Sequence, residues 1–359
     1  MQRYNFFISI INNFAQNNLF DAMKRILMAC QAAFFALVLA GCDSGMAGYK
    51  KQLHVKVGPA PGLIFKRYED VLFNLDTADF QQELLRVQAD YYPFLEGDLS
   101  NPLAVKYLKD FALDPFSLSL YQEVKETFPD LKEVQTIVDG VYQHFNYYYP
   151  DLKLPERVFT CVSGLDRDIP SVMFVEDALV ISLDWYLAGD VVYDLVGMPK
   201  YLSERTNVAV LAKDLGSQIY KGYLQKGHKQ TNLLEEMVYV GKQLFFVEAM
   251  CPSLPDKDLL GYSDAQVEWA LENEGNLWAD LVGNQRLYTS DYDAFRVFFA
   301  DGPFTNEYSH EAPPRLGEFL GLNIVRSYMN THDCTLQDLM ENTDLQGVFL
   351  DSKYKPKKY

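Results

Sequence analysis

The sequence lacks the residue spacings that most often bind metal ions. It contains five histidines and five cysteines among 359 residues. The histidines show neither His-x-His nor His-x-x-x-His spacing, and no two cysteines are spaced as Cys-x-x-Cys. This pattern excludes a zinc ribbon and a thioredoxin-type redox site. The acidic segments 166–168 and 256–258 also lack the spacing of a calcium loop, so we predict that both are solvated loops.

Motifs of the common hydrolases and nucleotide-binding enzymes are also absent. There is no Gly-x-Ser-x-Gly nucleophile elbow, no phosphate-binding P-loop and no Gly-x-Gly-x-x-Gly turn. Positive charge is scarce as well, with 32 Lys and Arg against 49 Asp and Glu. Residues 1–42 hold three of the basic residues and one acidic residue, so the remainder carries 29 against 48, a formal net charge of −19. Such a charge balance repels phosphate, and we predict no nucleic-acid partner.

A leader peptide precedes the bulk of the chain. Met23-Lys24-Arg25 is basic, and residues 26–40 carry no charge. A run of roughly 15 uncharged residues suits the core of a signal peptide and is short for a membrane span. It ends in Leu39-Ala40-Gly41-Cys42, the lipobox pattern of bacterial lipoproteins. We therefore predict cleavage before Cys42 and attachment of lipid to this cysteine, which would anchor the protein to a membrane.

The leader sets the predicted domain boundaries. Residues 1–22 precede the basic segment and suggest an upstream start codon, with Met23 as the true start; a cytoplasmic extension is the alternative. Residues 23–41 are the predicted signal peptide, and 42–50 the lipidated cysteine with its tether. No repeat or Pro/Gly/Ser-rich linker divides 51–359, which we predict to be one domain. We expect this domain in the cell envelope, at the outer membrane on its periplasmic or surface face.

Apolar periodicity predicts an α+β fold that is mostly helical. Three β-branched and aromatic runs indicate a small antiparallel sheet, with Glu176-Asp177 as the hairpin turn between the last two runs. Gly317 and Gly321 are four residues apart in a helical stretch and should let another backbone approach closely. The predicted strands are 158–162, 172–175 and 179–183, and the predicted helices include 80–87, 134–142, 207–224, 232–250, 263–281 and 315–330.

The first helix after the sheet resembles the active helix of HExxH zinc metallopeptidases. Lys213 takes the position of the first histidine of the pattern, Asp214 that of the glutamate and Ser217 that of the second histidine. Glu236 on the next helix could match the third zinc ligand. A lysine brings positive charge to the metal's position, and serine is a poor zinc ligand, so we predict no bound zinc. Lys213 could instead occupy that position and pair with Glu236. The alternative is an ordinary helix whose likeness arose by chance.

Several further blocks resemble one family, the gliding-motility lipoprotein GldB of Bacteroidetes. The likeness runs from about the hairpin to the C-terminus and includes the helix that contains Tyr239-Val240-Gly241-Lys242. Ala312 and Pro314 depart from the expected Ser and Gly. The resemblance implies a zincin-like lipoprotein of gliding motility without the metal-binding histidines. It supplies no catalytic residue and no cofactor. The matching blocks are 234–250, 260–263, 269–278, 301–305, 311–317, 321–329 and 352–356.

Three functional hypotheses follow. The first is a non-catalytic envelope lipoprotein, held to the membrane by its lipid, that binds or scaffolds proteins of a motility or secretion apparatus. The second is a metallopeptidase-like hydrolase with the unusual ligands Asp214, His228 and Glu236. The third is a carrier of small ligands, since the chain has 24 Tyr and 24 Phe. Only three cysteines, Cys161, Cys251 and Cys334, follow Cys42, so at most one disulfide can form among them.

Overall fold

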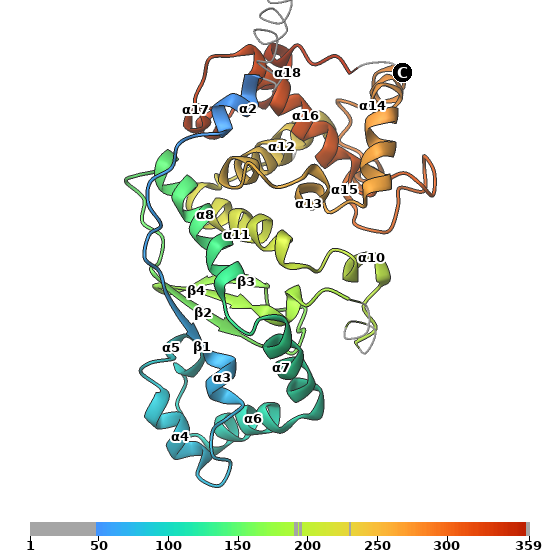
Figure 1. The fold of residues 1–359 in the computed structure, drawn as a ribbon. Coiled ribbons are helices and arrows are strands. Elements are labelled where there is room, and N and C mark those ends of the chain that lie inside the picture. Colours follow the sequence, from blue (N-terminus) through green and yellow to red (C-terminus); the bar gives the residue numbers. More distant parts are fainter. Residues whose placement is uncertain (1–47, 190–192, 194–195, 230, 357–359) are drawn as a thin grey trace, which may run out of the picture. The chain divides into compact units, whose positions relative to one another are not determined.

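The computed structural model describes residues 48–189, 193, 196–229 and 231–356. The chain divides into the units 1–47 and 48–359, so Cys42 and the predicted leader lie outside the described residues. No helix in the described part is both long enough and apolar enough to cross a membrane. The described chain is mostly helical around a four-stranded sheet, which confirms the predicted α+β class (Figure 1).

The sheet consists of β1 (Ile64–Arg67), β2 (Arg157–Cys161), β3 (Val172–Val175) and β4 (Ala178–Ser182), in the order β1-β2-β4-β3. Strands β3 and β4 form the predicted antiparallel hairpin, with Glu176 at φ 49° in its turn. The predicted antiparallel sheet is otherwise wrong, because β2 runs parallel to both β1 and β4. Strand β1 was not predicted because it has only four residues, two of them charged.

Alternation along the strands divides the core into two clusters on opposite faces of the sheet. Val158, Leu179 and Ile181 belong to the larger cluster, which continues into the C-terminal helices. Phe159 and Val180 belong to the smaller cluster, which continues into the helices of residues 68–112. Both faces are therefore covered, and this explains why β4 is buried at every position. Both clusters lie within residues 48–359, so this unit has the core that it needs to fold by itself.

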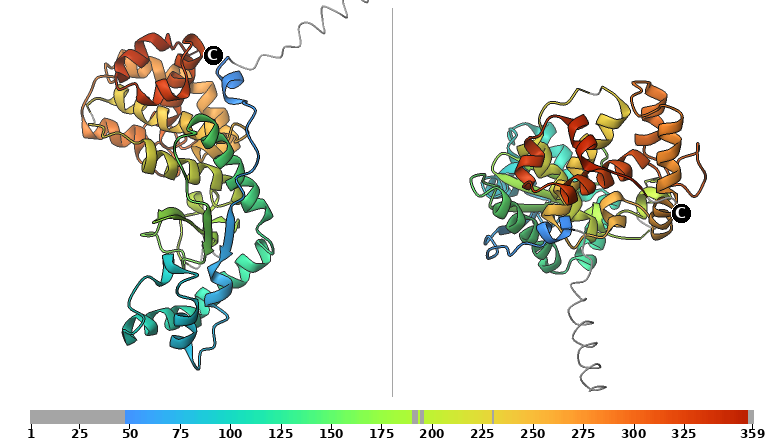
Figure 2. Two further views of the ribbon diagram at one scale, coloured as in Figure 1. Left: turned by 90° about the vertical axis from the view of Figure 1, so that its left-hand side faces the viewer. Right: turned by 90° about the horizontal axis from the view of Figure 1, so that it is seen from above.

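Two sets of helices accompany the sheet, one between β1 and β2 in the chain and one after β4. The first set is divided between the two faces of the sheet: residues 68–112 contribute to the smaller cluster, and residues 120–148 contribute to the larger cluster, which continues into the later set (Figure 2). The predicted helices at 80–87, 134–142, 232–250, 263–281 and 315–330 are confirmed, and the one at 207–224 is a composite of 3₁₀, α and π turns. The first set is α3 (Tyr68–Leu72), α4 (Phe80–Val87), α5 (Tyr92–Leu95), α6 (Pro102–Leu113), α7 (Pro115–Thr127) and α8 (Lys132–Tyr148). The later set is α10 (Lys200–Ser203), α11 (Leu211–Ile219), α12 (Leu233–Met250), α13 (Asp256–Leu260), α14 (Asp264–Gly283), α15 (Tyr292–Phe299), α16 (Leu316–Thr331), α17 (Leu336–Glu341) and α18 (Leu345–Ser352), and α2 (Gly48–Leu53) packs on α16.

The segment 256–258 forms the start of α13, which corrects the predicted solvated loop. Both carboxylate oxygens of Asp256 accept hydrogen bonds from Arg326 of α16, at 2.6 and 2.9 Å. The same guanidinium donates to both oxygens of Glu248 at 2.9 and 3.0 Å, and both Arg326 and Glu248 are buried. This bidentate pairing offsets the cost of burying the charges and joins α12, α13 and α16.

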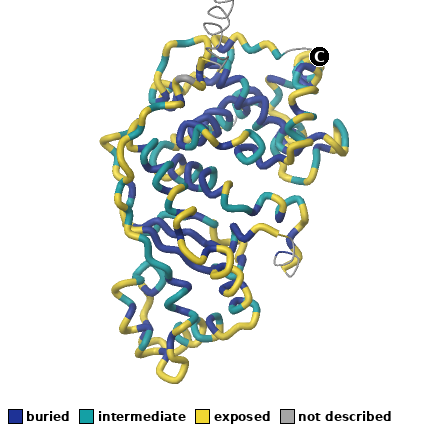
Figure 3. The backbone as a smooth tube through the Cα atoms, in the orientation of Figure 1, coloured by how far each residue is buried: buried dark blue, intermediate teal, exposed yellow. Residues whose placement is uncertain are grey.

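Helices α12 and α16 cross at two glycines, and both helices are among the most deeply buried parts of the chain (Figure 3). A Cβ atom at Gly321 would collide with the carbonyl of Met237, and one at Gly241 would collide with the backbone of Gly321. The close approach predicted from Gly317 and Gly321 is therefore confirmed, with Gly321 at the crossing itself. Gly317 makes room for the ring of Phe299 and for the backbone carbonyl of Phe298.

We expect Gly321→Ala to lower the free energy of unfolding by about 1–3 kcal/mol, because the added methyl group forces the two backbones apart. Gly140→Ala is the matched control, since Gly140 also lies within a helix but an added Cβ would meet no other atom within 4 Å. It should raise stability by about 0.5–1 kcal/mol through the better helix propensity of alanine. Urea unfolding of residues 48–359 measures both values, and equal effects of the two substitutions would contradict the crossing.

Candidate functional site

Helix α11 carries the residues that match the metallopeptidase pattern. It follows a 3₁₀ turn, Val208–Val210, that is capped by the side chain of Asn207, which accepts from the Ala209 N–H at 3.0 Å. The face of α11 that includes Leu215 and Gly216 is buried, and Gly216 allows Val247 of α12 to pack against it. Lys213, Asp214 and Ser217 are less buried than this face. Packing on α12 therefore leaves the matched positions on the side of α11 that is partly open.

Lys213 and Asp214 line a cavity of about 190 Å³. Its walls come from five parts of the chain that are distant in sequence: the residue before β3, the 3₁₀ helix Leu183–Tyr186 after β4, the segment before α11, α13 with the glycine that follows it, and the residue before α16. Ser217 does not line it. The other lining residues are Ser171, Trp185, Tyr186, Arg205, Thr206, Val210, Asp258, Gly261 and Arg315.

The carboxylate of Asp214 is held by two hydroxyl groups. Its Oδ2 accepts from the Tyr186 hydroxyl at 2.8 Å and from Ser171 Oγ at 3.1 Å. Burial raises the pKa of Asp214, and the hydrogen bond from Tyr186 and the charge of Lys213 act against this. The two hydroxyls thus fix the orientation of the carboxylate and satisfy one of its oxygens.

The ammonium group of Lys213 is the unusual feature of the cavity. Within the described part of the chain it forms no hydrogen bond and no ion pair. Burial, and then the charge of Arg315, lower the pKa of Lys213 to about 8. The nearby charges of Glu318 and Asp214 act against this shift without direct contact. A second donor, the indole Nε1 of Trp185, is buried beside the same cavity and has no partner among the described residues.

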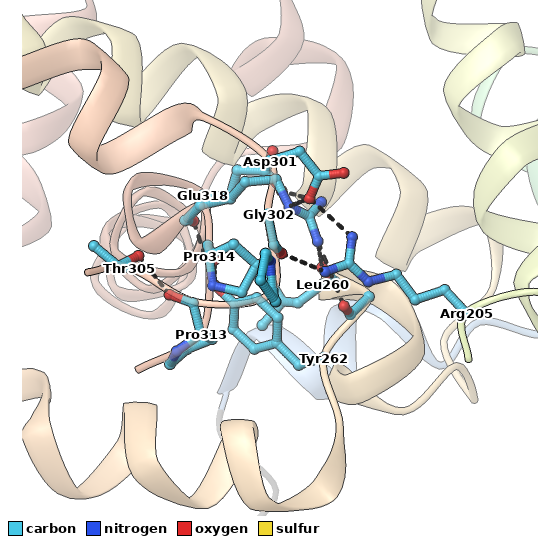
Figure 4. A network of polar contacts seen from close by, with 12 residues as sticks. Arg205, Leu260, Tyr262, Asp301, Gly302, Thr305, Pro313, Pro314 and Glu318 are labelled. Carbon is cyan, nitrogen blue, oxygen red and sulfur yellow. Dashed lines mark hydrogen bonds and ion pairs between the residues drawn. The ribbon is translucent and has the colours of Figure 1, made fainter. Parts of the chain in front are cut away.

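Two arginines form a network at the edge of this cavity. Arg315 has φ 56° and precedes α16; its Nη2 donates to the Leu260 carbonyl at 2.6 Å and its Nη1 to Glu318 at 3.2 Å. Asp301 Oδ1 accepts a hydrogen bond from Arg205 Nη1 at 2.9 Å (Figure 4). The same oxygen forms an ion pair with Arg315 Nε at 3.3 Å. Although burial opposes it, the hydrogen bond from Arg205 and the charge of Arg315 lower the pKa of Asp301.

The loop that carries Arg315 is fixed by hydrogen bonds to its backbone. The Tyr262 hydroxyl donates to the Pro314 carbonyl at 2.8 Å, and the Thr305 hydroxyl donates to the Pro313 carbonyl at 2.7 Å (Figure 4). Because carbonyl oxygens accept these bonds, the loop tolerates the two prolines. Arg205, Trp185, Tyr186 and Arg315 were not predicted as site residues. The segments 301–305 and 311–317 gave the only signal, as separate matching blocks that meet here.

The predicted pairing of Lys213 with Glu236 is wrong. Glu236 Oε2 lies 3.1 Å from His228 Nε2, and His228 stacks on Tyr239 with 3.9 Å between the ring centroids. His228 lines a different cavity, together with Glu235 and Lys242. The structure therefore brings Lys213 and Asp214 together, and it places His228 and Glu236 elsewhere.

Zinc does not fit the groups present at the cavity. Zinc in proteins is bound by thiolates, neutral imidazoles and carboxylates, whereas Lys213 offers an ammonium group and Asp214 is already engaged. In the described part of the chain, no three His, Cys, Asp or Glu side chains are grouped as metal ligands. The cysteines Cys161, Cys251 and Cys334 are all free thiols in this part.

Comparison with known proteins gives one match. The model of a family described as "Gliding motility protein GldB" matches residues 50–356. The chain belongs to the GldB family of gliding motility proteins. Neither the curated proteins nor the solved structures contain a match to this chain. Membership of the GldB family confirms the resemblance seen in the sequence and associates the protein with gliding motility, and the zincin-like relationship stays a prediction.

We expect Lys213→Met to stabilise the protein at pH 7 by roughly 1–3 kcal/mol, because it removes a charge that the folded state disfavours. In the folded protein Lys213 loses its proton near pH 8, and in the unfolded chain near pH 10.5. Stability of the natural protein should therefore rise between these pH values, and the advantage of the variant should shrink. Urea unfolding at pH 7, 9 and 10.5 measures the difference.

The control for this prediction is Lys221→Met, which removes an exposed lysine two turns further along the chain. It should change stability by no more than about 0.5 kcal/mol at pH 7. A destabilised Lys213→Met variant at pH 7 would show that the ammonium has a stabilising partner in the protein and would contradict the unpaired state.

Proposed function

We propose that this member of the GldB family is a lipid-anchored, non-catalytic binding component of a gliding or secretion machine in the cell envelope. Its lipid at Cys42 would hold residues 48–359 at the outer membrane, on the periplasmic or surface face. The unpaired Lys213 at the degenerate metallopeptidase helix is the observation that carries the proposal. A cation in this position suits recognition of an anionic group and does not suit the activation of water by a metal.

The groups around the cavity favour a carboxylate from a partner protein. Lys213 and the Trp185 N–H both lack acceptors within the described residues, so an acceptor with negative charge would satisfy both. A volume of about 190 Å³ admits a side chain or a chain end and is too small for a folded segment. Arg205 and Arg315 add positive potential, although Asp301 and Glu318 pair with them. An aspartate, a glutamate or a C-terminal carboxylate of an envelope protein fits this description.

The hydrolase hypothesis has less support. It requires Asp214, His228 and Glu236 to share one metal ion, but His228 and Glu236 bond to each other away from the Asp214 cavity. Metal analysis of purified residues 48–359 after dialysis is the direct check. We expect far less than one zinc per chain and no chelator-sensitive peptidase activity. Stoichiometric zinc that is lost together with peptide cleavage would reject the non-catalytic proposal.

The binding role is tested in a gliding host that lacks its own GldB-family protein. We expect the natural chain to restore motility, and Cys42→Ala to fail because the domain is no longer anchored. Lys213→Met should also fail, since it removes the cation that binds the partner, while Lys221→Met should restore motility. Because Lys213→Met is expected to be more stable than the natural protein, its failure could not be attributed to unfolding. Full motility of Lys213→Met would contradict the role of the cavity.

A further inference from the structure

A second and larger cavity, of about 470 Å³, lies against the sheet face that carries the smaller core cluster. Pockets for small molecules usually have volumes of about 300–1,000 Å³ and mainly apolar walls. Protein interiors otherwise contain few voids larger than a water molecule. Its walls come from α3, α5, α6, the segment 161–170, β3 and β4, and include Leu72, Phe94, Leu108, Phe111, Met173 and Val180.

One buried polar group in the wall has no partner. The side chain of Tyr68 is 5% exposed, yet its hydroxyl makes no hydrogen bond within the described chain. Burial raises the pKa of Tyr68, so the hydroxyl keeps its proton and remains a donor. Its ring is stacked on Phe94, with 4.0 Å between the centroids and 3° between the planes. A fixed, buried donor without an acceptor is costly in a folded protein, and it indicates that a ligand supplies the acceptor.

The charges around the cavity restrict the ligand to neutral molecules. Among the residues that the structure describes, no Lys, Arg or His lines the walls, so a carboxylate or phosphate would be buried without a counter-charge. Burial raises the pKa of Cys161 as well, and its thiol is therefore neutral. The carboxylate in the lining, Asp168, is exposed and would repel an anion at the edge.

We propose that this cavity binds a neutral amphiphile, an alkyl or aryl alcohol, ester or ketone, whose oxygen accepts a hydrogen bond from Tyr68. The apolar walls bury the hydrocarbon part, and the unpaired Tyr68 hydroxyl orients the oxygen. Tyr107 of α6, which is 73% exposed, and the partly exposed Ile169 are lining residues that reach solvent and mark the entrance. The site shares no residue with the Lys213 cavity, so it is independent of the proposed carboxylate recognition.

The test uses residues 48–359 with the neutral fluorescent probe N-phenyl-1-naphthylamine and two competitors, 1-octanol and octane. We expect the probe to bind with saturation and both competitors to displace it. Tyr68→Phe should weaken the binding of 1-octanol by about 2–10-fold, which is the usual contribution of one hydrogen bond. The binding of octane should be unchanged. The thermal midpoint of Tyr68→Phe should not fall, because the lost hydroxyl has no partner.

A second pair of variants tests the location. Leu108→Trp fills the cavity and should abolish probe binding, whereas Leu103→Trp on the same helix, 75% exposed and outside the cavity, should leave it unchanged. The proposal is overturned if the probe does not bind with saturation, or if Leu108→Trp and Leu103→Trp behave alike. If Tyr68→Phe weakens the binding of 1-octanol and of octane equally, the Tyr68 hydroxyl is not the donor to the ligand. Tighter binding of octanoate than of 1-octanol would reject a neutral ligand.

Discussion

The contact of α12 and α16 at Gly241 and Gly321 is the constraint on which the position of the candidate site depends. Because neither glycine has a side chain, the two backbones touch, and each helix then fixes another part of the site. Helix α12 holds α11, and with it Lys213, through the packing of Val247 on Gly216. Helix α16 begins directly after Arg315. The crossing therefore sets the separation between the lysine of one helix and the arginine that precedes the other.

Charge is distributed unequally within this arrangement. Asp301 lies between Arg205 and Arg315, Glu318 pairs with Arg315, and Asp214 is held by hydroxyl groups. Each carboxylate thus has a nearby donor, and Lys213 is the cation left over. A half-buried charge without a partner costs stability, as its lowered pKa indicates. Such a cost is typical of binding sites, where the missing partner arrives with the ligand.

The two cavities are lined by neighbouring residues of one short loop. Pro170 lines the apolar cavity, and Ser171, the next residue, lines the polar one. Consecutive residues of this loop therefore contribute to cavities of different chemical character. One site takes its polar donors from the helices after the sheet, and the other takes its apolar walls from the helices before β2.

The sequence by itself determined the hairpin, the main helices, the family and the absence of histidines at residues 213 and 217. These follow from local patterns: alternation, helical periodicity and the identity of residues 213, 214 and 217. Only the tertiary structure decided that β2 runs parallel to its neighbours, that Asp256 pairs with Arg326, and that Lys213 has no partner while Glu236 bonds to His228. The reason is physical, because parallel pairing, buried ion pairs and cavities are made by segments far apart in the chain, and no local pattern records which of them meet.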